Sequence, residues 1–350
     1  MTRVGIIGCG GISHFHYEGY EKAGAKIVHV CDIRREAAEA VGARYKAKVS
    51  TDYHALLADK DVELVSVLTI ASTHKAICLA AIKAGKGVVC EKTLSDNAAD
   101  SAEVCRAAEK AKTWLATAYM KNFFGAARKA RALLADMGPV ISIHARTWQP
   151  FASLWDAELP EFAATKPSGI VRNYGGGVLV CGGSHIINLI HGFGGRPLKV
   201  CGNMRSREGL DFDIQTNALL WLEGGAMAHL EACWHPLAYG GYERNGWDER
   251  LEINTTKGRL DFYTVTWNRP LNNGALLVHQ EAATGVTTEY RFPAMNPFDE
   301  EMADMVERFE AGDPPFPSGW DGYVVDEVIA HITASAKQGA ALPVRYADRV

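Results

Sequence analysis

Short apolar runs alternate with amphipathic segments through the first third of the chain. The runs typical of buried strands are 4–7, 25–31, 62–69, 87–90 and 114–119. Apolar residues at helical spacing lie between them, in 34–41, 52–58, 74–84 and 96–111. Strands and helices in this order form a parallel sheet with helices on both faces. The pattern predicts a doubly wound α/β domain over residues 1–122.

The pattern changes beyond residue 122, where strand-like runs dominate. These runs are 140–148, 198–204, 213–222, 226–234, 250–255, 259–263 and 275–278. Turns such as Gly224-Gly225 and Lys257-Gly258 join several of them, which favours antiparallel neighbours. Helices are expected over 126–135, around 185–189, and over 299–309 and 321–337. We therefore expect residues 123–350 to form an α+β domain on a mainly antiparallel sheet.

The first strand leads directly into Gly8-x-Gly10, followed by Gly11 and Ile12. Glycines at such a turn let the backbone approach a pyrophosphate closely, and the following helix directs its unpaired N–H groups at the phosphates. Ser13 stands where this motif usually has Gly or Ala. The pattern predicts a dinucleotide-binding Rossmann domain.

Asp32 follows the second strand at the spacing expected for an acid that binds the adenosine ribose. Its carboxylate would repel a 2′-phosphate, so NAD is favoured over NADP. Arg34 and Arg35 follow, and either could reach a 2′-phosphate, so NADP stays possible. The alternative role for Asp32 is the N-cap of the next helix, and both roles can hold together.

The composition argues against several classes of partner. The net charge is −4 and no long Lys/Arg cluster is present, which disfavours nucleic acid and anionic membranes. No apolar run reaches the roughly 20 residues of a membrane span. The eight cysteines are scattered without a CxxC pair, as is typical of buried thiols in a reducing compartment. We expect a cytoplasmic protein with a small-molecule ligand and no structural disulfide.

Glu91-Lys92 follows a predicted strand, at the edge where open α/β sheets bind ligands. A lysine there could orient a substrate oxygen and stabilise charge as hydride moves. The alternative is a surface lysine paired with Glu91.

Cys181, His185 and Asn188 would share one face of an α-helix that follows Gly175-Gly176-Gly177. His185 could move the proton that accompanies hydride loss, although a lone histidine is more often a core residue. Zinc bound by Cys181 and His185 would need a third ligand that the sequence does not indicate, so no metal is expected.

Five short motifs occur in this order along the chain: Gly8-Cys9-Gly10-Gly11-Ile12, Glu91-Lys92, Tyr119-Met120-Lys121, Gly175-Gly176-Gly177 and Gly183-Ser184-His185. Together they resemble the glucose–fructose oxidoreductase and inositol dehydrogenase family, known as Gfo/Idh/MocA. The resemblance spans nearly the whole chain, because the turns at 224–226 and 256–258 and the segment at 321–322 also match. It implies NAD(P)-dependent oxidation of sugars or cyclitols, a Rossmann domain and an open-faced β-sheet domain.

The resemblance also assigns residues to roles. It implies that Lys92 and His185 are catalytic, with Cys181 at the place of an acid that the family commonly has. The expected cofactor-binding residues are Gly8, Gly10, Gly11, Ile12, Asp32, Arg34, Thr69, His74, Glu91 and Lys92. The expected substrate-binding residues are Lys92, Tyr119, Lys121, Trp148, Arg172, Asn173, Cys181, His185 and Trp234.

Four positions depart from the family pattern. Thr93 stands in place of a proline after Glu-Lys, and Ile70 in place of a proline after Thr69. Cys181 and Asn188 stand where acids are common, so the usual Lys-Asp-His triad is incomplete. A neutral thiol carries no negative charge to favour an imidazolium, whereas a Cys181 thiolate stabilised by Lys92 or a neighbouring cation would do so.

The sequence is interpreted as an NAD-dependent dehydrogenase of a secondary hydroxyl on a sugar, glycoside or cyclitol. Two alternatives stay open. One is a reductase or epimerase-like enzyme with retained cofactor, and the other is a sensor of the same fold without turnover. A homodimer or homotetramer through the open sheet is expected from the resemblance.

Overall fold

The computed structural model describes residues 1–267 and 273–348, which form two compact units. The first unit contains Met1–Met120, Phe298–Asp326 and the stretch that begins at Ala347. The second contains Lys121–Pro297 and Glu327–Tyr346. The sequence analysis expected one boundary, after residue 122. The division in the structure is different, because the chain returns to the first unit at Phe298.

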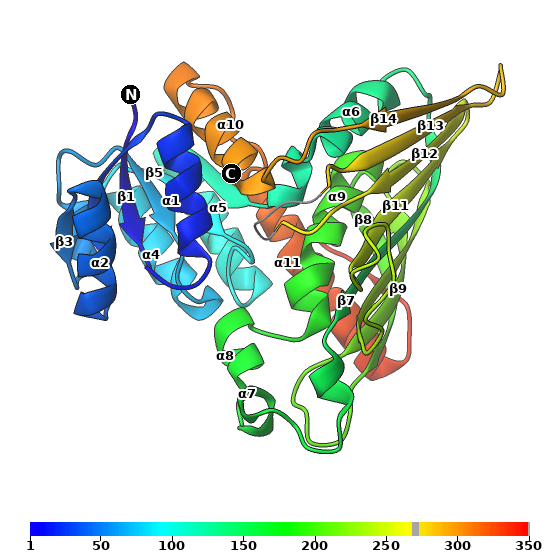
Figure 1. Ribbon diagram of the computed structural model, residues 1–350, viewed down its shortest axis with the longest axis horizontal. Helices are drawn as coiled ribbons and strands as arrows, with labels where there is room; N and C mark the ends of the chain where they lie inside the picture. Colours follow the sequence, from blue (N-terminus) through cyan, green and yellow to red (C-terminus); the bar gives the residue numbers. More distant parts are fainter. Residues whose placement is uncertain (268–272, 349–350) are drawn as a thin grey trace. The chain divides into compact units, whose positions relative to one another are not determined.

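A six-stranded parallel sheet forms the first unit, in the order β3-β2-β1-β4-β5-β6 (Figure 1). Its strands are β1 (Arg3–Ile7), β2 (Lys26–Cys31), β3 (Lys48–Ser50), β4 (Leu64–Val67), β5 (Gly87–Glu91) and β6 (Leu115–Ala118). Its helices are α1 (Ser13–Lys22), α2 (Arg35–Tyr45), α3 (Tyr53–Leu57), α4 (Ala71–Lys83), α5 (Ala98–Ala111) and α10 (Pro297–Ala311). The strand order reverses between β1 and β4, so the crossovers on either side cover opposite faces. The doubly wound Rossmann sheet is confirmed.

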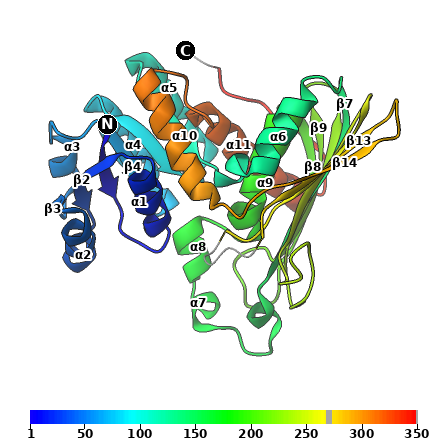
Figure 2. The same ribbon diagram turned by 45° about the horizontal axis from the view of Figure 1, so that its top comes forward.

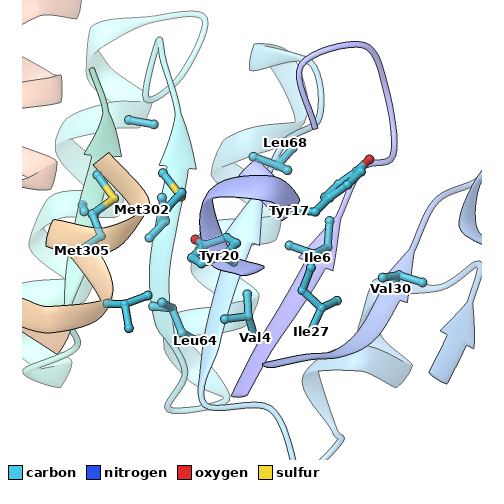
Figure 3. Packing of buried hydrophobic residues seen from close by; sticks show 14 of the residues in the cluster. Val4, Ile6, Tyr17, Tyr20, Ile27, Val30, Leu64, Leu68, Met302 and Met305 are labelled. Carbon is cyan, nitrogen blue, oxygen red and sulfur yellow. The ribbon is translucent and has the colours of Figure 1, made fainter. Parts of the chain in front are cut away.

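Helix α10 completes the core of this unit. Met302 and Met305 on α10 join Tyr20 on α1 and Leu64 on β4 in one buried cluster (Figure 3). Gly19 allows the two helices to meet, because a Cβ there would lie 2.7 Å from the Met302 side chain. The amphipathic pattern of α10 is visible in the sequence, but the sheet that it covers is not.

A nine-stranded sheet forms the second unit, in the order β14-β13-β12-β11-β7-β10-β9-β8-β15. Its strands are β7 (Val140–Pro150), β8 (Pro197–Arg205), β9 (Gln215–Leu222), β10 (Met227–His235), β11 (Asp248–Thr255), β12 (Gly258–Tyr263), β13 (Leu276–Glu281), β14 (Thr287–Arg291) and β15 (Leu342–Pro343). Only the β7–β10 pair among these described strands is parallel. The mainly antiparallel sheet is therefore confirmed.

Helices α6 (Gly125–Leu134) and α9 (Ser184–Gly194) lie on one face of this sheet, whereas the opposite face carries no helix in the drawn part of the chain (Figures 1 and 2). The remaining elements are η1 (Met120–Phe123), η2 (Ala152–Trp155), α7 (Glu161–Ala164), α8 (Gly169–Tyr174), η3 (Leu179–Gly183) and α11 (Gly319–Gln338), of which α11 spans both units. The stretch Gly169–Gly194 is apolar and long enough to cross a membrane, but 72% of its apolar window is buried, as in a core helix.

The structure corrects the sequence prediction in two respects. Strands β3, β14 and β15 were not expected, because edge strands are short and need little apolar surface. Leu179–Gly183 is a π-helix, not part of a continuous α-helix. A π-helix advances by a different angle per residue, so α-helical spacing does not describe the relation of Cys181 to His185.

Candidate functional site

Four predicted site residues follow neighbouring parallel strands of the first unit. Gly8 follows β1, Asp32 follows β2, Thr69 follows β4 and Lys92 follows β5. The carboxyl ends of parallel strands meet at one edge of a sheet, and ligands of open α/β sheets bind there, at the point where the strand order reverses. The topology therefore brings these four residues to the same edge.

The glycine turn has the shape that a dinucleotide requires. Gly8 has φ +100°, and a Cβ there would lie 2.7 Å from the Leu68 carbonyl oxygen, so protein packing alone excludes a side chain. At Gly10 and Gly11 a Cβ would meet no protein atom within 4 Å. These two glycines therefore leave room for a close-lying pyrophosphate. The first turn of α1 carries no acid, and the Ile12 side chain makes no cap, so its N–H groups suit an anion.

Asp32 holds the glycine turn from the end of β2. One carboxylate oxygen accepts a hydrogen bond from the Cys9 backbone N–H at 2.7 Å, and the other accepts from the Arg34 N–H at 2.8 Å. The Arg34 guanidinium Nε lies 3.4 Å from the same carboxylate. Burial, and then the Asp32 charge, raise the pKa of Cys9 to about 12, so its thiol stays neutral.

Ser13 fits the third position of the glycine motif through local hydrogen bonds. Its buried hydroxyl donates to the Gly10 carbonyl and shares a hydrogen bond with the Tyr17 hydroxyl. The departure from Gly or Ala therefore leaves no unpaired hydroxyl beneath the phosphate-binding turn.

His74 lies in the interior of the first unit, with its residue 1% exposed. Its Nδ1 lies 2.8 Å from the Thr93 carbonyl oxygen and its Nε2 lies 3.0 Å from the Thr69 carbonyl oxygen. The ring therefore connects the loop after β4 to the loop after β5. This arrangement supports the cofactor-side edge of the sheet through the backbone.

Glu91 is buried, and both of its carboxylate oxygens have partners. Oε1 lies 2.9 Å from Nε2 of His16 on α1, and Oε2 accepts a hydrogen bond from the Lys92 backbone N–H at 2.9 Å. The peptide bond between Lys92 and Thr93 is cis.

In the second unit, the π-helix η3 carries Cys181 and leads into α9, which carries His185. Asp213 anchors the beginning of this segment: its carboxylate accepts from the Leu179 N–H at 3.0 Å and from the Thr216 hydroxyl at 2.7 Å. A Cβ at Gly177 would lie 2.1 Å from the Asp213 carbonyl oxygen, so only glycine fits. Single π-helical turns occur frequently at functional sites. Cys181 and His185 are both partly exposed.

Lys121 is part of a buried ion pair, in which its ammonium contacts Glu249 on β11. Thr147 and Gln149 on β7 also donate to this carboxylate. Burial raises the pKa of Glu249, but Lys121 and these donors bring it below its usual value. The π-helix packs directly on this group, because a Cβ at Gly182 would lie 2.9 Å from both the Thr147 and Gln149 side chains.

Two further candidates are tied into the second unit's core. Trp234 is 2% exposed and donates from its indole N–H to Gln149 at 2.8 Å. Asn188 accepts from the Asn122 side chain at 2.7 Å, and Asn122 in turn accepts from Arg131 at 2.9 Å. Helical spacing grouped Asn188 with His185, whereas its hydrogen-bond partner Asn122 lies on η1.

The remaining substrate candidates occupy three different settings. Arg172 and Asn173 are exposed on α8. Trp148 on β7 packs beside His235, with ring centroids 5.3 Å apart. Tyr119 is buried in the first unit, where burial and then the Asp326 charge raise its pKa well above the usual range. In the described parts of the chain, no group of three His, Cys, Asp or Glu side chains is arranged to hold a metal ion.

Sequence reasoning did not single out several residues that the structure places at these sites. His16 contacts Glu91, Asp213 anchors the π-helix and Glu249 lies beneath it. Ile33 is exposed next to Asp32. The position of Ile33 directly after Asp32 is a signal that could have identified it, but the buried pairs depend on partners far away in the sequence.

Comparison with protein families finds two matches that together cover most of the chain. Residues 2–119 match the oxidoreductase family with an NAD-binding Rossmann fold, GFO/IDH/MocA. Residues 127–261 match the GFO/IDH/MocA C-terminal domain. The first match coincides with the six-stranded sheet, and the second covers β7 to β11 and the first part of β12.

Among curated relatives, inositol 2-dehydrogenase from Salmonella typhimurium is 25% identical over 343 residues, covering 95% of this chain and 92% of the relative. Inositol 2-dehydrogenase from Pseudomonas savastanoi pv. phaseolicola is 42% identical over 108 residues, covering 30% of this chain and 31% of that protein. Among solved structures, levoglucosan dehydrogenase in complex with NADH and levoglucosan superposes with a TM-score of 0.84 at 18% identity, covering 99% of this chain and 100% of that one.

Proposed function

The chain belongs to the GFO/IDH/MocA family of oxidoreductases, and from that premise we propose that it is an NAD-dependent dehydrogenase. The proposed substrate is a sugar, glycoside or cyclitol that is oxidised at a secondary hydroxyl. The observation that carries the proposal is the edge of the first sheet, where the open glycine turn, Asp32 and the Glu91-Lys92 segment meet.

The residues at this edge fit NAD. The backbone at Gly10 and Gly11 would approach the pyrophosphate, and the N-terminus of α1 would face its charge. Asp32 would accept hydrogen bonds from the ribose hydroxyls while it holds the turn. Ile33 and Ile70, which directly follow Asp32 and Thr69, are exposed apolar residues that could contact the adenine ring. The Arg34 guanidinium near Asp32 leaves NADP as the weaker alternative.

Bound NAD supplies a hydride acceptor, and the protein supplies orientation and proton transfer. Lys92 would hold the substrate oxygen and stabilise the charge that develops on it. His185 would accept the hydroxyl proton as the C–H bond breaks. Cys181, on the π-helix that leads into α9, would leave His185 without the carboxylate that the family resemblance implies at this position.

The class of substrate is supported by the relatives. The relatives are named after inositol and levoglucosan, and both compounds are rings with several secondary hydroxyls. We propose a substrate of this chemistry, with the exposed Arg172 and Asn173 among its hydrogen-bonding partners.

The test is a screen of inositol isomers, anhydrosugars and glycosides with NAD and with NADP, followed by reduced-nicotinamide absorbance. Turnover with NAD supports the proposal. Lys92→Ala and His185→Ala should lower kcat by roughly a hundredfold or more, because each removes an interaction made in the transition state. Lys75→Ala, a surface lysine paired with Asp100, is the matched control.

The same screen separates the alternatives. Turnover of a ketone or epimer without added cofactor would favour an enzyme with retained cofactor. Tight binding of NADH and a cyclitol without turnover of any compound would favour a sensor, and would overturn the dehydrogenase.

We also propose a cytoplasmic homodimer or homotetramer that uses the open face of the nine-stranded sheet. Leu219 and Met227 are exposed on that face, as expected for an interface. Light scattering of the parent and of a Leu219→Glu variant tests this: a monomeric parent would contradict it.

A further inference from the structure

Two buried histidines contact the residues on either side of Lys92. His16, on α1, contacts the side chain of Glu91, which precedes the lysine. His74, on α4, contacts the backbone carbonyl of Thr93, which follows it. Both histidines are 1% exposed or less, so neither ring is available to solvent.

The contact of His16 belongs to a continuous buried network. Nε2 of His16 lies 2.9 Å from Glu91 Oε1, and its Nδ1 lies 3.4 Å from the Ser66 hydroxyl. The Tyr20 hydroxyl donates to Ser66 at 3.2 Å. Through Glu91 Oε2, the same network reaches the backbone N–H of Lys92. Helix α1, strand β4 and strand β5 are therefore connected to the lysine by hydrogen bonds.

The contact of His74 fixes the other side. Its Nδ1 lies 2.8 Å from the Thr93 carbonyl and its Nε2 lies 3.0 Å from the Thr69 carbonyl. Two carbonyl oxygens accept hydrogen bonds from one ring only when both nitrogens carry protons, whereas burial lowers the pKa of His74. In the neutral ring, Nδ1 carries the proton and donates to the Thr93 carbonyl oxygen, which is the shorter of the two contacts.

We propose that His16 and His74 are positioning residues that fix the backbone on both sides of Lys92. The inference rests on the proposed role of Lys92 in hydride transfer. Neither histidine touches the reacting atoms: each acts by holding Glu91 or Thr93. Losing one anchor lets the lysine move, and a displacement of about 1 Å at a reacting group can lower the rate by about a hundredfold.

The histidines differ from ordinary core residues in what they join. His29 on β2 is a matched comparison: its Nδ1 lies 2.9 Å from Asp59 and its Nε2 lies 3.1 Å from the Ser50 hydroxyl. It has the same kinds of partner as His16, a carboxylate and a serine, and it is similarly buried. Its partners lie outside the 91–93 segment, so its loss should affect stability without affecting Lys92.

The first experiment compares His16→Leu, His16→Gln and His29→Leu in the substrate screen. We expect His16→Leu to lower kcat by roughly ten- to a hundredfold, with KM and the NADH dissociation constant within about threefold of the parent. A glutamine amide can replace Nε2 as donor to Glu91, so His16→Gln should recover most of kcat. His29→Leu should keep the parental kcat per folded molecule. Equal kcat in His16→Leu and His29→Leu would overturn the proposal for His16.

The second experiment uses the two ring nitrogens of His74. An asparagine amide places its donor near the position of Nδ1, toward Thr93, whereas a glutamine amide places it near Nε2, toward Thr69. His74→Asn should therefore retain more kcat than His74→Gln, although both lose the ring. The reverse order, or equal values, would overturn the proposal for His74.

Two readouts separate this inference from the proposed function. In a Lys92→Ala background, His16→Leu should cause no further loss of rate, since its effect acts through the lysine. Normal turnover of Lys92→Ala would overturn the role of Lys92 itself. For a protein without turnover, the rate at which acetic anhydride modifies Lys92, read by peptide mass spectrometry, replaces kcat. That rate should change in His16→Leu and not in His29→Leu, and equal rates would overturn the positioning role.

Discussion

The Asp32 carboxylate accepts a hydrogen bond from the backbone N–H of Cys9 at 2.7 Å, which joins the end of β2 to the glycine turn after β1. One acid therefore performs two tasks. It accepts a hydrogen bond from the turn that contains Gly10, and under the proposed function it would present negative charge to the adenosine ribose.

This double role predicts that Asp32→Ser weakens NAD binding by roughly tenfold and narrows the preference for NAD over NADP. NAD loses its ribose acceptor and part of the support of the turn, while NADP loses a repulsive charge with Arg34 in reach. Calorimetric titration of both cofactors measures the change. Asp52→Ser is the control, because Asp52 caps α3 through the His54 N–H in a similar way. Tighter binding of NADP by the parent would contradict the prediction.

A carboxylate at position 181 should change the pH dependence of oxidation. Negative charge on the π-helix that leads into α9 would favour the imidazolium of His185, so the base would stay protonated to higher pH. Cys181→Asp should therefore shift the acidic limb of the pH–rate profile to higher pH. Ala283→Asp, in the exposed turn after β13, controls for the added charge. An unchanged profile would mean that Cys181 only packs against its neighbours and that the proton acceptor lies elsewhere.

Glu301 on α10 should make the protein less stable as pH rises. Burial, and then the charge of Glu91, raise the pKa of Glu301 well above its usual range. The native state therefore keeps this proton where the unfolded chain has lost it, so the stability is fully present below the unfolded-state pKa, near 4.5, and declines above it.

Glu301→Gln removes that ionisation. It should increase the free energy of unfolding at pH 8 by roughly 1–2 kcal/mol and have less effect at pH 5. Urea unfolding at the two pH values measures the difference. Glu307→Gln, exposed on the same helix, should change neither value. A destabilised variant at pH 8 would show that Glu301 carries its charge in the native state.

Lys121 offers a choice between a structural and a substrate-binding role. Because its ammonium pairs with the buried Glu249, Lys121→Met should destabilise the protein by about 3–5 kcal/mol, the cost of leaving a buried charge uncompensated. Thermal unfolding measures this loss, and Lys199→Met on the exposed side of β8 is the control. A stable variant with a raised substrate KM would favour substrate binding instead.

The sequence prediction was closest where structure depends on neighbouring residues. The glycine turn and Asp32 are recognisable because turn geometry and the strand–helix spacing limit which residues can follow one another. It was least complete at Leu179–Gly183, where the α-helical spacing of Cys181 and His185 is interrupted by a π-helix. At Gly182 this π-helix packs against the side chains of Thr147 and Gln149, and no local sequence pattern predicts these contacts.

By itself, the sequence determined most of the order of strands and helices, the class of both sheets, the dinucleotide motif and the family resemblance, because periodicity and turn chemistry are properties of short segments. Only the tertiary structure decided which buried charges meet. His16 and Glu91 are 75 positions apart, and Lys121 and Glu249 are 128 apart. Such pairs form because a buried charge or polar group needs a partner, and which partner it reaches depends on how the sheets bring distant strands together.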